Sequence, residues 1–302
     1  MELFPYIGCT PLLTQQKRFQ DRFGHPNAYL EMNPSLYISD HGNITILVRR
    51  INYRKFQDKQ FILYENQSNS AYIILRGKLG DKHKPFFSEN EYTSNELTCE
   101  WEANYPSYPT YWIGMEDIRF CNETDVLVTV PEKNSSGNPC IFRGTLKDST
   151  IRSFVRCEPS NVEKNWMPYT ELNGTTSVVY SVSPFQTKSV LENKIVTIPT
   201  PLEKVLETYH GSTNGIVYYE FWRLFLIHVN KERTYHRWLL YHPVKHDIRV
   251  SEPFVFFKDS YIEFPCSLCE HNGRVFISLG VNDDKAYVLE VEKKDINTSL
   301  QL

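Results

Sequence analysis

The segment 112–120, WIGMEDIRF, contains two adjacent acids, Glu116 and Asp117, that are suited to proton transfer. Adjacent side chains of a β-strand point to opposite faces, so we expect only one of these carboxylates to enter a given cleft. The apolar neighbours of the pair would partly desolvate that acid, which raises the pKa of a carboxyl group and suits proton donation to a leaving oxygen. The alternative interpretation is a carboxylate paired with Arg119 at a strand end.

Two further segments combine basic residues with small or aromatic ones. In 162–169, VEKNWMPY, Lys164 is a point donor for a phosphate or a sugar hydroxyl, and Trp166 beside it is a candidate sugar platform, as is Trp112. In 209–219, YHGSTNGIVYY, a Gly- and Ser-rich loop presents His210 just before an apolar strand. A surface lysine, core aromatics and an ordinary turn are the alternatives.

Other candidates depend on where their strands lie. Tyr235, His236 and Arg237 open one predicted strand, and Glu263 precedes another. They would reach a common central face if both strands were innermost in their sheets. Near the N-terminal end, an inward-directed Arg50 would bind a carboxylate, a phosphate or a sugar, whereas an exposed edge charge is equally consistent with the pattern.

Short β-type runs separated by polar turns extend along the whole chain and predict an all-β protein. Turn-forming residues such as those of 271–273 and 283–284 separate paired apolar runs, as in hairpins. The layout repeats at intervals of roughly fifty to sixty residues, which suits about five four-stranded blades. We therefore predict one five-bladed β-propeller domain over 1–302; a β-sandwich or a pair of barrels is also compatible with the strand spacing. The predicted strands include 44–53, 71–77, 126–130, 139–146, 216–229, 235–242, 274–281 and 285–292.

Composition excludes several classes of function. The net charge of -3 and the pI near 6.3 offer no broad attraction to nucleic acid. The chain lacks an apolar run of membrane-spanning length and a signal-peptide pattern at its start, so we expect a cytoplasmic protein without membrane insertion. Seven scattered cysteines include one C-x-x-C, at 266–269. Without a second pair or clustered histidines they indicate free thiols, and neither a metal nor a cofactor is expected; a redox or metal protein is a minor alternative.

Taken in order along the chain, these pieces resemble glycoside hydrolase family 130, the group of β-mannoside phosphorylases and their relatives. The Gly-x-Glu-Asp-x-Arg piece at 114–119 and the Lys-Asn-Trp piece at 164–166 are the specific ones. Supporting pieces are 33–35 with 49–50, 210–211, 235–237 and the final 264–288. Ile118 stands where the family has proline, which leaves the aspartate in place but changes the loop around it.

The resemblance implies a five-bladed propeller with its site at the central end of the blades. It implies that Asp117 donates the proton to the leaving group. The basic residues that would gather inorganic phosphate are Arg50, Lys164 and His210, with His236 and Arg237 as further candidates. Attack from the opposite face would invert the anomeric centre.

The expected partners are therefore an oligosaccharide or glycan and either inorganic phosphate or a sugar nucleotide. Phosphorolysis or glycosyl transfer, acting on a β-mannoside, is favoured over hydrolysis because a hydrolase needs no anion site. A hydrolase and a non-catalytic glycan-binding propeller are the alternatives, and the sequence leaves the oligomeric state open.

Overall fold

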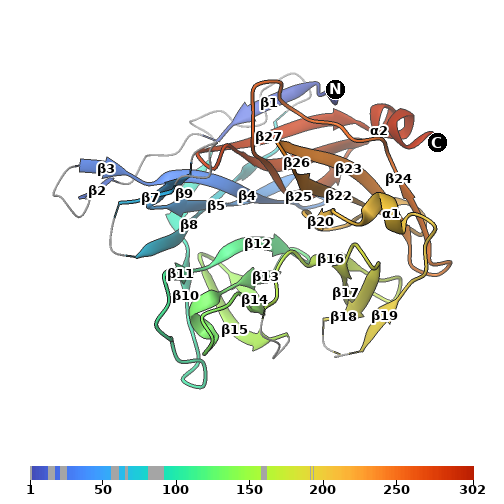
Figure 1. The fold of residues 1–302 in the computed structure, drawn as a ribbon. Coiled ribbons are helices and arrows are strands. Elements are labelled where there is room, and N and C mark those ends of the chain that lie inside the picture. Colours follow the sequence, from blue (N-terminus) through green and yellow to red (C-terminus); the bar gives the residue numbers. More distant parts are fainter. Residues whose placement is uncertain are drawn as a thin grey trace.

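The computed structural model describes residues 2–12, 18–20, 26–55, 61–64, 67–80, 92–157, 162–190, 192 and 194–302. The described strands form five main sheets of four or five strands, which are the blades of a β-propeller (Figure 1). The prediction of an all-β, five-bladed propeller is confirmed. No helix in the described part of the chain is long and apolar enough to cross a membrane.

The blades follow one another along the chain. Blade I contains β4 (Leu30–Ile38), β5 (Asn43–Ile51), β8 (Ser68–Lys78), β9 (Thr93–Glu96) and β11 (Trp112–Gly114). Blade II contains β12 (Glu116–Phe120), β13 (Asp125–Thr129), β14 (Ile141–Lys147), β15 (Thr150–Arg156) and β10 (Thr98–Cys99). Blade III contains β16 (Met167–Thr170), β17 (Thr176–Ser181), β18 (Gln186–Ser189) and β19 (Ile195–Thr197).

Blades IV and V complete the ring. Blade IV contains β20 (His210–Gly211), β21 (Ile216–Tyr219), β22 (Trp222–Asn230), β23 (Thr234–His242) and β24 (Asp247–Val250). Blade V contains β25 (Glu263–His271), β26 (Arg274–Val281), β27 (Lys285–Glu292) and β1 (Gly8–Pro11). Outside the blades lie the pairs β2 (Arg18–Gln20) with β3 (Pro26–Ala28) and β6 (Tyr53–Lys55) with β7 (Phe61–Leu63), the 3₁₀ turn η1 (Pro131–Lys133), and the helices α1 (Glu203–Leu206) and α2 (Lys293–Leu300).

The two ends of the described chain meet in blade V. Strand β1 pairs antiparallel with β27, from Gly8 opposite Glu290 to Pro11 opposite Tyr287. Figure 1 shows blue β1 beside red β27. This pairing covers the edge of the last sheet and closes the ring with hydrogen bonds, which protects a strand that would otherwise be an open edge.

The core lies between neighbouring blades, because the alternating apolar residues of each sheet face the next sheet. Leu47 and Ile74 of blade I pack in one cluster with Ile118 and Phe142 of blade II. Similar clusters join blade III to blade IV and blade IV to blade V. The innermost strands β4, β12 and β25 contact one another around the centre, and the starts of β4 and β12 carry the candidate site.

Candidate active site

Arg49 in β5 holds the two acids of the 114–119 motif. Its Nη2 donates to Glu116 Oε1 at 2.7 Å, and its Nη1 donates to Asp117 Oδ1 at 3.3 Å. Burial alone would lower the pKa of Arg49, but Tyr53, Glu116 and Asp117 together raise it well above its usual value. The guanidinium therefore remains charged, and it ties blade I to the first strand of blade II.

The expectation that Glu116 and Asp117 face opposite sides is wrong. The register of β12 against β13 shifts between Glu116 and Arg119, and Asp117 has a φ of 45°, in the left-handed region. This irregularity interrupts the alternation of a regular strand, so both carboxylates reach the same arginine. The left-handed conformation is uncommon for a residue other than glycine and is concentrated at functional sites.

Asn33 in β4 holds the same oxygen of Asp117 from the other side. Its Nδ2 donates to Asp117 Oδ1 at 3.1 Å. The approach depends on Gly280 in β26, where an added Cβ would lie 2.1 Å from Asn33 Oδ1. Among the described residues, both polar contacts of the carboxylate use Oδ1, and the side chain is 21% exposed. Asp117 is therefore fixed in position while part of its carboxyl group faces solvent.

Arg50, the predicted anion binder, lies on the other face of the sheet. Its Nε donates to Glu31 Oε1 at 3.0 Å, and it lines a pocket with Tyr29 and Asn69. The reason is the two-residue period of strand β5: Arg49 faces Asp117, so Arg50 faces away. The adjacent arginine pair was visible in the sequence, but the sequence does not indicate which member points inward.

Arg119, two residues after Asp117, has a buried guanidinium in which one nitrogen makes no hydrogen bond to the described residues. Its Nε donates to the main-chain oxygen of Ser212, and its Nη1 donates to the main-chain oxygen of Asp117 at 3.1 Å. Nη2 is buried without a hydrogen-bond partner among the described residues. A buried donor left unpaired costs about 1–3 kcal/mol, so this nitrogen is suited to an anionic ligand oxygen.

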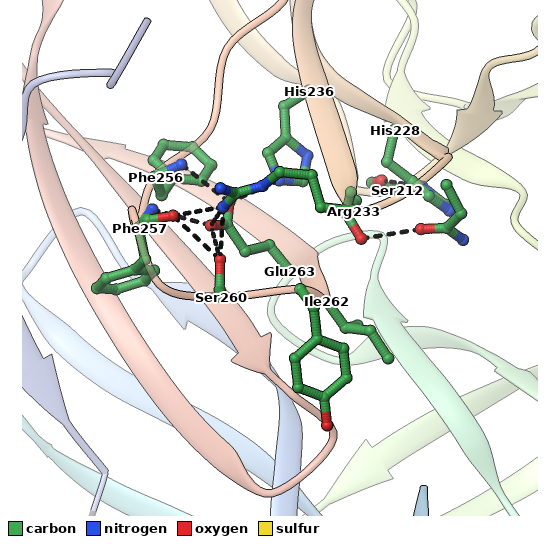
Figure 2. Close-up of polar contacts among 12 residues, drawn as sticks. Ser212, His228, Arg233, His236, Phe256, Phe257, Ser260, Ile262 and Glu263 are labelled. Atoms are coloured by element: carbon green, nitrogen blue, oxygen red, sulfur yellow. Dashed lines mark hydrogen bonds and ion pairs between the residues drawn. The ribbon is translucent and has the colours of Figure 1, made fainter. Parts of the chain in front are cut away.

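Arg119, Lys164, His210 and His228 form what we call the basic cluster. The His210 and His228 rings lie 5.9 Å apart, and His228 Nδ1 is hydrogen-bonded to Ser212 Oγ at 2.6 Å (Figure 2). Burial and the charge of Lys164 lower the pKa of His210. Burial lowers the pKa of His228 well below its usual value, and the charges of His236, His210, Arg119 and Lys164 lower it further.

The basic cluster brings together two of the predicted anion binders, Lys164 and His210. Lys164 precedes β16, His210 forms β20, and Gly211 permits the approach of the two blades, because an added Cβ would lie 2.3 Å from the main-chain oxygen of Asn165. Arg119 and His228 were not predicted. Arg119 is part of the motif and was considered only as an ion-pair partner, whereas His228 lies inside an apolar strand without a sequence signal.

Glu263 and His236 form a buried structural network. The carboxylate of Glu263 accepts hydrogen bonds from the main-chain nitrogens of Phe256 and Phe257, at 2.9 and 2.8 Å. It also accepts from His236 Nε2 at 3.0 Å and from Ser260, as Figure 2 shows. Burial alone would raise the pKa of Glu263, but the bonds from His236 and Ser260 lower it. The carboxylate of Glu263 is 1% exposed, and these hydrogen bonds occupy its oxygens. It therefore stabilises the loop before β25.

The side chains of 235–237 and Glu263 were expected to share a central face if the strands of both were innermost in their sheets, and only one of these strands is innermost. β25 is the innermost strand of blade V, but β23, which carries Tyr235, His236 and Arg237, lies between β22 and β24. Arg237 Nε donates to Tyr209 Oη at 3.0 Å, and Tyr235 contacts Glu232. These side chains therefore stabilise blade IV, and they do not gather around Asp117.

The two predicted sugar platforms differ in exposure. Trp166 is 1% exposed, and its Nε1 donates to Glu163 Oε2 at 2.9 Å, so its ring is not available to a sugar. Trp112 in β11 is 38% exposed and meets Tyr53 edge to face at 5.6 Å. Trp112 precedes the 114–119 motif by two residues, and of the two predicted platforms it is the one with an exposed side chain.

The cysteines form no disulfide: all seven are free thiols, and Cys266 and Cys269 are both buried. Burial raises the pKa of the Cys269 thiol to about 12. Within the described ranges, no group of three His, Cys, Asp or Glu side chains is arranged to hold a metal ion.

No protein-family model matches the chain, and no curated protein matches its sequence. Solved structures match its fold. β-1,2-Mannobiose phosphorylase from Listeria innocua aligns with a TM-score of 0.60 at 15% identity, over 95% of this chain and 99% of that one. This chain has the propeller fold of the mannoside phosphorylases and their relatives.

Two further structures carry the same fold with different activities. A glycosyl hydrolase from Bacteroides ovatus aligns with a TM-score of 0.57 at 12% identity, over 92% of this chain and 89% of that one. A GDP-Man-dependent mannosyltransferase from Leishmania mexicana aligns with a TM-score of 0.53 at 10% identity, over 87% and 85%. The fold is therefore common to proteins described as a phosphorylase, a hydrolase and a transferase, and the choice between these reactions depends on the site.

Proposed function

We propose that this protein makes or breaks a glycosidic bond, with Asp117 as the acid or base and the basic cluster as the site of an anion. The observation that carries the proposal is the buried Nη2 of Arg119, which has no hydrogen-bond partner among the described residues. Arg119 follows Asp117 by two positions in the sequence. Ser212 links Arg119 to the histidines, because its main-chain oxygen accepts from Arg119 Nε and its Oγ is hydrogen-bonded to His228 Nδ1. The ring of His210 lies 5.9 Å from the ring of His228. The charge of Lys164 contributes, after burial, to the lowered pKa of His210. A positive site of this kind favours phosphorolysis or glycosyl transfer over hydrolysis, because water carries no charge to be held.

In the phosphorolytic direction, a phosphate oxygen held by the basic cluster attacks the anomeric carbon. The bond to the leaving sugar oxygen breaks, and the proton of Asp117 moves to that oxygen, so the products are a sugar 1-phosphate of inverted configuration and a shorter sugar. In glycosyl transfer the same cluster receives the diphosphate leaving group, and Asp117 accepts the proton of the acceptor hydroxyl. In both reactions, Arg49 and Asn33 hold the carboxyl group of Asp117 in place.

The proposed substrate is a β-mannoside, with Trp112 as the platform for the sugar beyond the cleaved bond. The 114–119 and 164–166 motifs support this class, as do the activities of the mannobiose phosphorylase and the mannosyltransferase that share the fold. An exposed aromatic ring packs against the C–H face of a pyranose. Inorganic phosphate and a sugar nucleotide are the two candidate anionic partners.

The test is a turnover assay of the purified protein. Manno-oligosaccharides are incubated with and without inorganic phosphate, and manno-oligosaccharides are incubated with GDP-mannose. Phosphate-dependent release of mannose 1-phosphate identifies a phosphorylase, and extension that depends on GDP-mannose identifies a transferase. Release of mannose at the same rate without either anion would contradict the anion site and identify a hydrolase. Binding of the sugars without turnover would contradict the catalytic proposal.

A further inference from the structure

We propose that a groove on blades III and IV, remote from Asp117, is a second and non-catalytic site for a neutral oligosaccharide. The groove has a volume of about 540 Å³. Its lining includes Leu172, Tyr219, Glu220, Phe221, Trp222 and Lys245. We call it the far groove. Its existence does not depend on the chemistry proposed at Asp117.

The far groove lies at the opposite end of blade IV from the basic cluster. Trp222 begins β22, and His228, a member of the basic cluster, lies near the end of the same strand. Six residue-to-residue steps of extended strand separate them by about 20 Å. Leu172 likewise follows β16, whereas Lys164 precedes that strand. A sugar in the far groove therefore cannot contact the groups around Asp117.

Tyr219 and Phe221 in the far groove are exposed, and Trp222 beside them is half-buried. Phe221 is 42% exposed and Tyr219 is 44% exposed. Tyr219 Oη donates to Asn297 Oδ1 at 2.9 Å. The guanidinium of Arg249 lies 5.0 Å from the ring centre of Trp222. Rings fixed in this way lose little conformational entropy on binding, and their faces suit the C–H surface of a pyranose.

The turn that carries these rings does not contain the residue types that two-residue hairpin turns favour. Tyr219 pairs with Trp222, so Glu220 and Phe221 form a two-residue hairpin turn, and Glu220 has a φ of 26°. Such turns favour Asn and Gly at positive φ. A glutamate and an exposed phenylalanine at these two positions are unfavourable for the turn itself. Strain and exposed apolar area of this kind mark binding surfaces.

The charges of the far groove indicate a neutral ligand. Glu220 and Lys245 are both exposed and of opposite sign. Their charges offset each other, so neither a phosphate group nor a cationic peptide gains from the groove as a whole. Together they offer acceptors and donors for hydroxyl groups. Aromatic faces flanked by one carboxylate and one ammonium group fit an uncharged oligosaccharide.

The test uses protein labelled with 5-fluorotryptophan, whose five tryptophans give separate fluorine resonances. The Trp222 resonance is assigned with Trp222→Phe and the Trp112 resonance with Trp112→Phe. Linear manno-, cello- and xylo-oligosaccharides of four to six sugars are titrated into the Asp117→Asn protein. We expect the Trp222 resonance to shift in a saturable manner. Phe221→Ala should weaken this response by about tenfold or more, whereas Val155→Ala, an exposed apolar change in blade II, should leave it unaltered.

The two sites are distinguished by their own resonances. A shift at Trp222 without turnover in the assay above would support the far groove and contradict the catalytic proposal alone. A Trp222 resonance that does not move with any of the three sugar series would overturn the far-groove proposal. So would a dimer in light scattering that Phe221→Ala converts to a monomer, because the groove would then be a contact between two copies of the chain.

Discussion

Arg49 Nη1 lies 3.3 Å from Asp117 Oδ1, and this ion pair joins the second strand of blade I to the first strand of blade II. Arg49 is 4% exposed, and its Nε also donates to Ser70 Oγ at 2.7 Å. The proposed acid is therefore positioned by a neighbouring blade and not by its own strand. Any change that moves Arg49 should move the carboxyl group.

The two adjacent arginines of β5 should differ in their effect on activity. Arg49→Lys keeps the charge but cannot contact Glu116 and Asp117 at once, so we expect turnover to fall by about tenfold or more and stability by about 1–3 kcal/mol. Arg50→Lys, on the opposite face, should retain most of the activity. Steady-state kinetics and urea denaturation of both variants measure this, and equal losses of turnover would contradict the assignment.

Asp117→Asn should remove catalysis and preserve the fold. The amide is nearly isosteric with the carboxyl group but cannot transfer the proton, so we expect turnover to fall by about 10²–10⁴-fold. Asp148→Asn is the matched control, because Asp148 also has a positive φ, of 51°, but lies in the turn after β14. Wild-type turnover in Asp117→Asn, with unchanged thermal unfolding, would show that another group is the acid.

Lys164→Gln should act on the anionic partner. Lys164 is exposed, so the change should leave stability within about 0.5 kcal/mol of wild type. We expect KM for phosphate or sugar nucleotide to rise several-fold, with a smaller effect on KM for the neutral sugar. The pKa of His210 should rise, because the charge of Lys164 lowers it. Proton NMR titration of His210 checks this, and an unchanged pKa would contradict the proximity of the two side chains.

Because of His228, we expect the free energy of unfolding to fall as the pH is lowered into the mildly acidic range. Its pKa is well below the usual value near 6.5 in the folded chain, so the unfolded chain binds the proton first as the pH falls. The contribution of His228 to stability is therefore fully present above pH 6.5 and is lost progressively below it. His228→Gln should reduce the loss of unfolding free energy between about pH 7.5 and 5.5. An identical loss in the variant would exclude His228 as the source.

Gly280→Ala should disturb catalysis through Asn33. The new methyl group would lie 2.1 Å from Asn33 Oδ1, so Asn33 must move away from Asp117. We expect kcat to fall more than KM rises, because the proposed sugar platform, Trp112, is untouched. Gly8→Ala is the control: its nearest contact, 3.2 Å, is with the flexible end of Glu290. A wild-type kcat in Gly280→Ala would show that Asn33 has no role in positioning.

The fold could be predicted from the sequence because it depends on local patterns. The apolar β-type runs 44–53, 126–130 and 274–281 became β5, β13 and β26, and the turn signal at 271–273 lies at the junction of β25 and β26. Each blade is a local unit of consecutive strands, so periodicity and turn chemistry determine most of it. The closing pair of β1 and β27 is a long-range contact that no local pattern indicated.

The sequence by itself determined the chemical types near the site, an Asp in a Gly-x-Glu-Asp-x-Arg motif with a lysine and a histidine farther along the chain. Only the tertiary structure decided which face each side chain occupies. The irregular register of β12 brought Glu116 and Asp117 to one arginine, burial removed Trp166 from any surface role, and β23 proved to be a middle strand. Orientation follows from strand register and from contacts between blades, and a shift of one residue reverses every side chain of a strand.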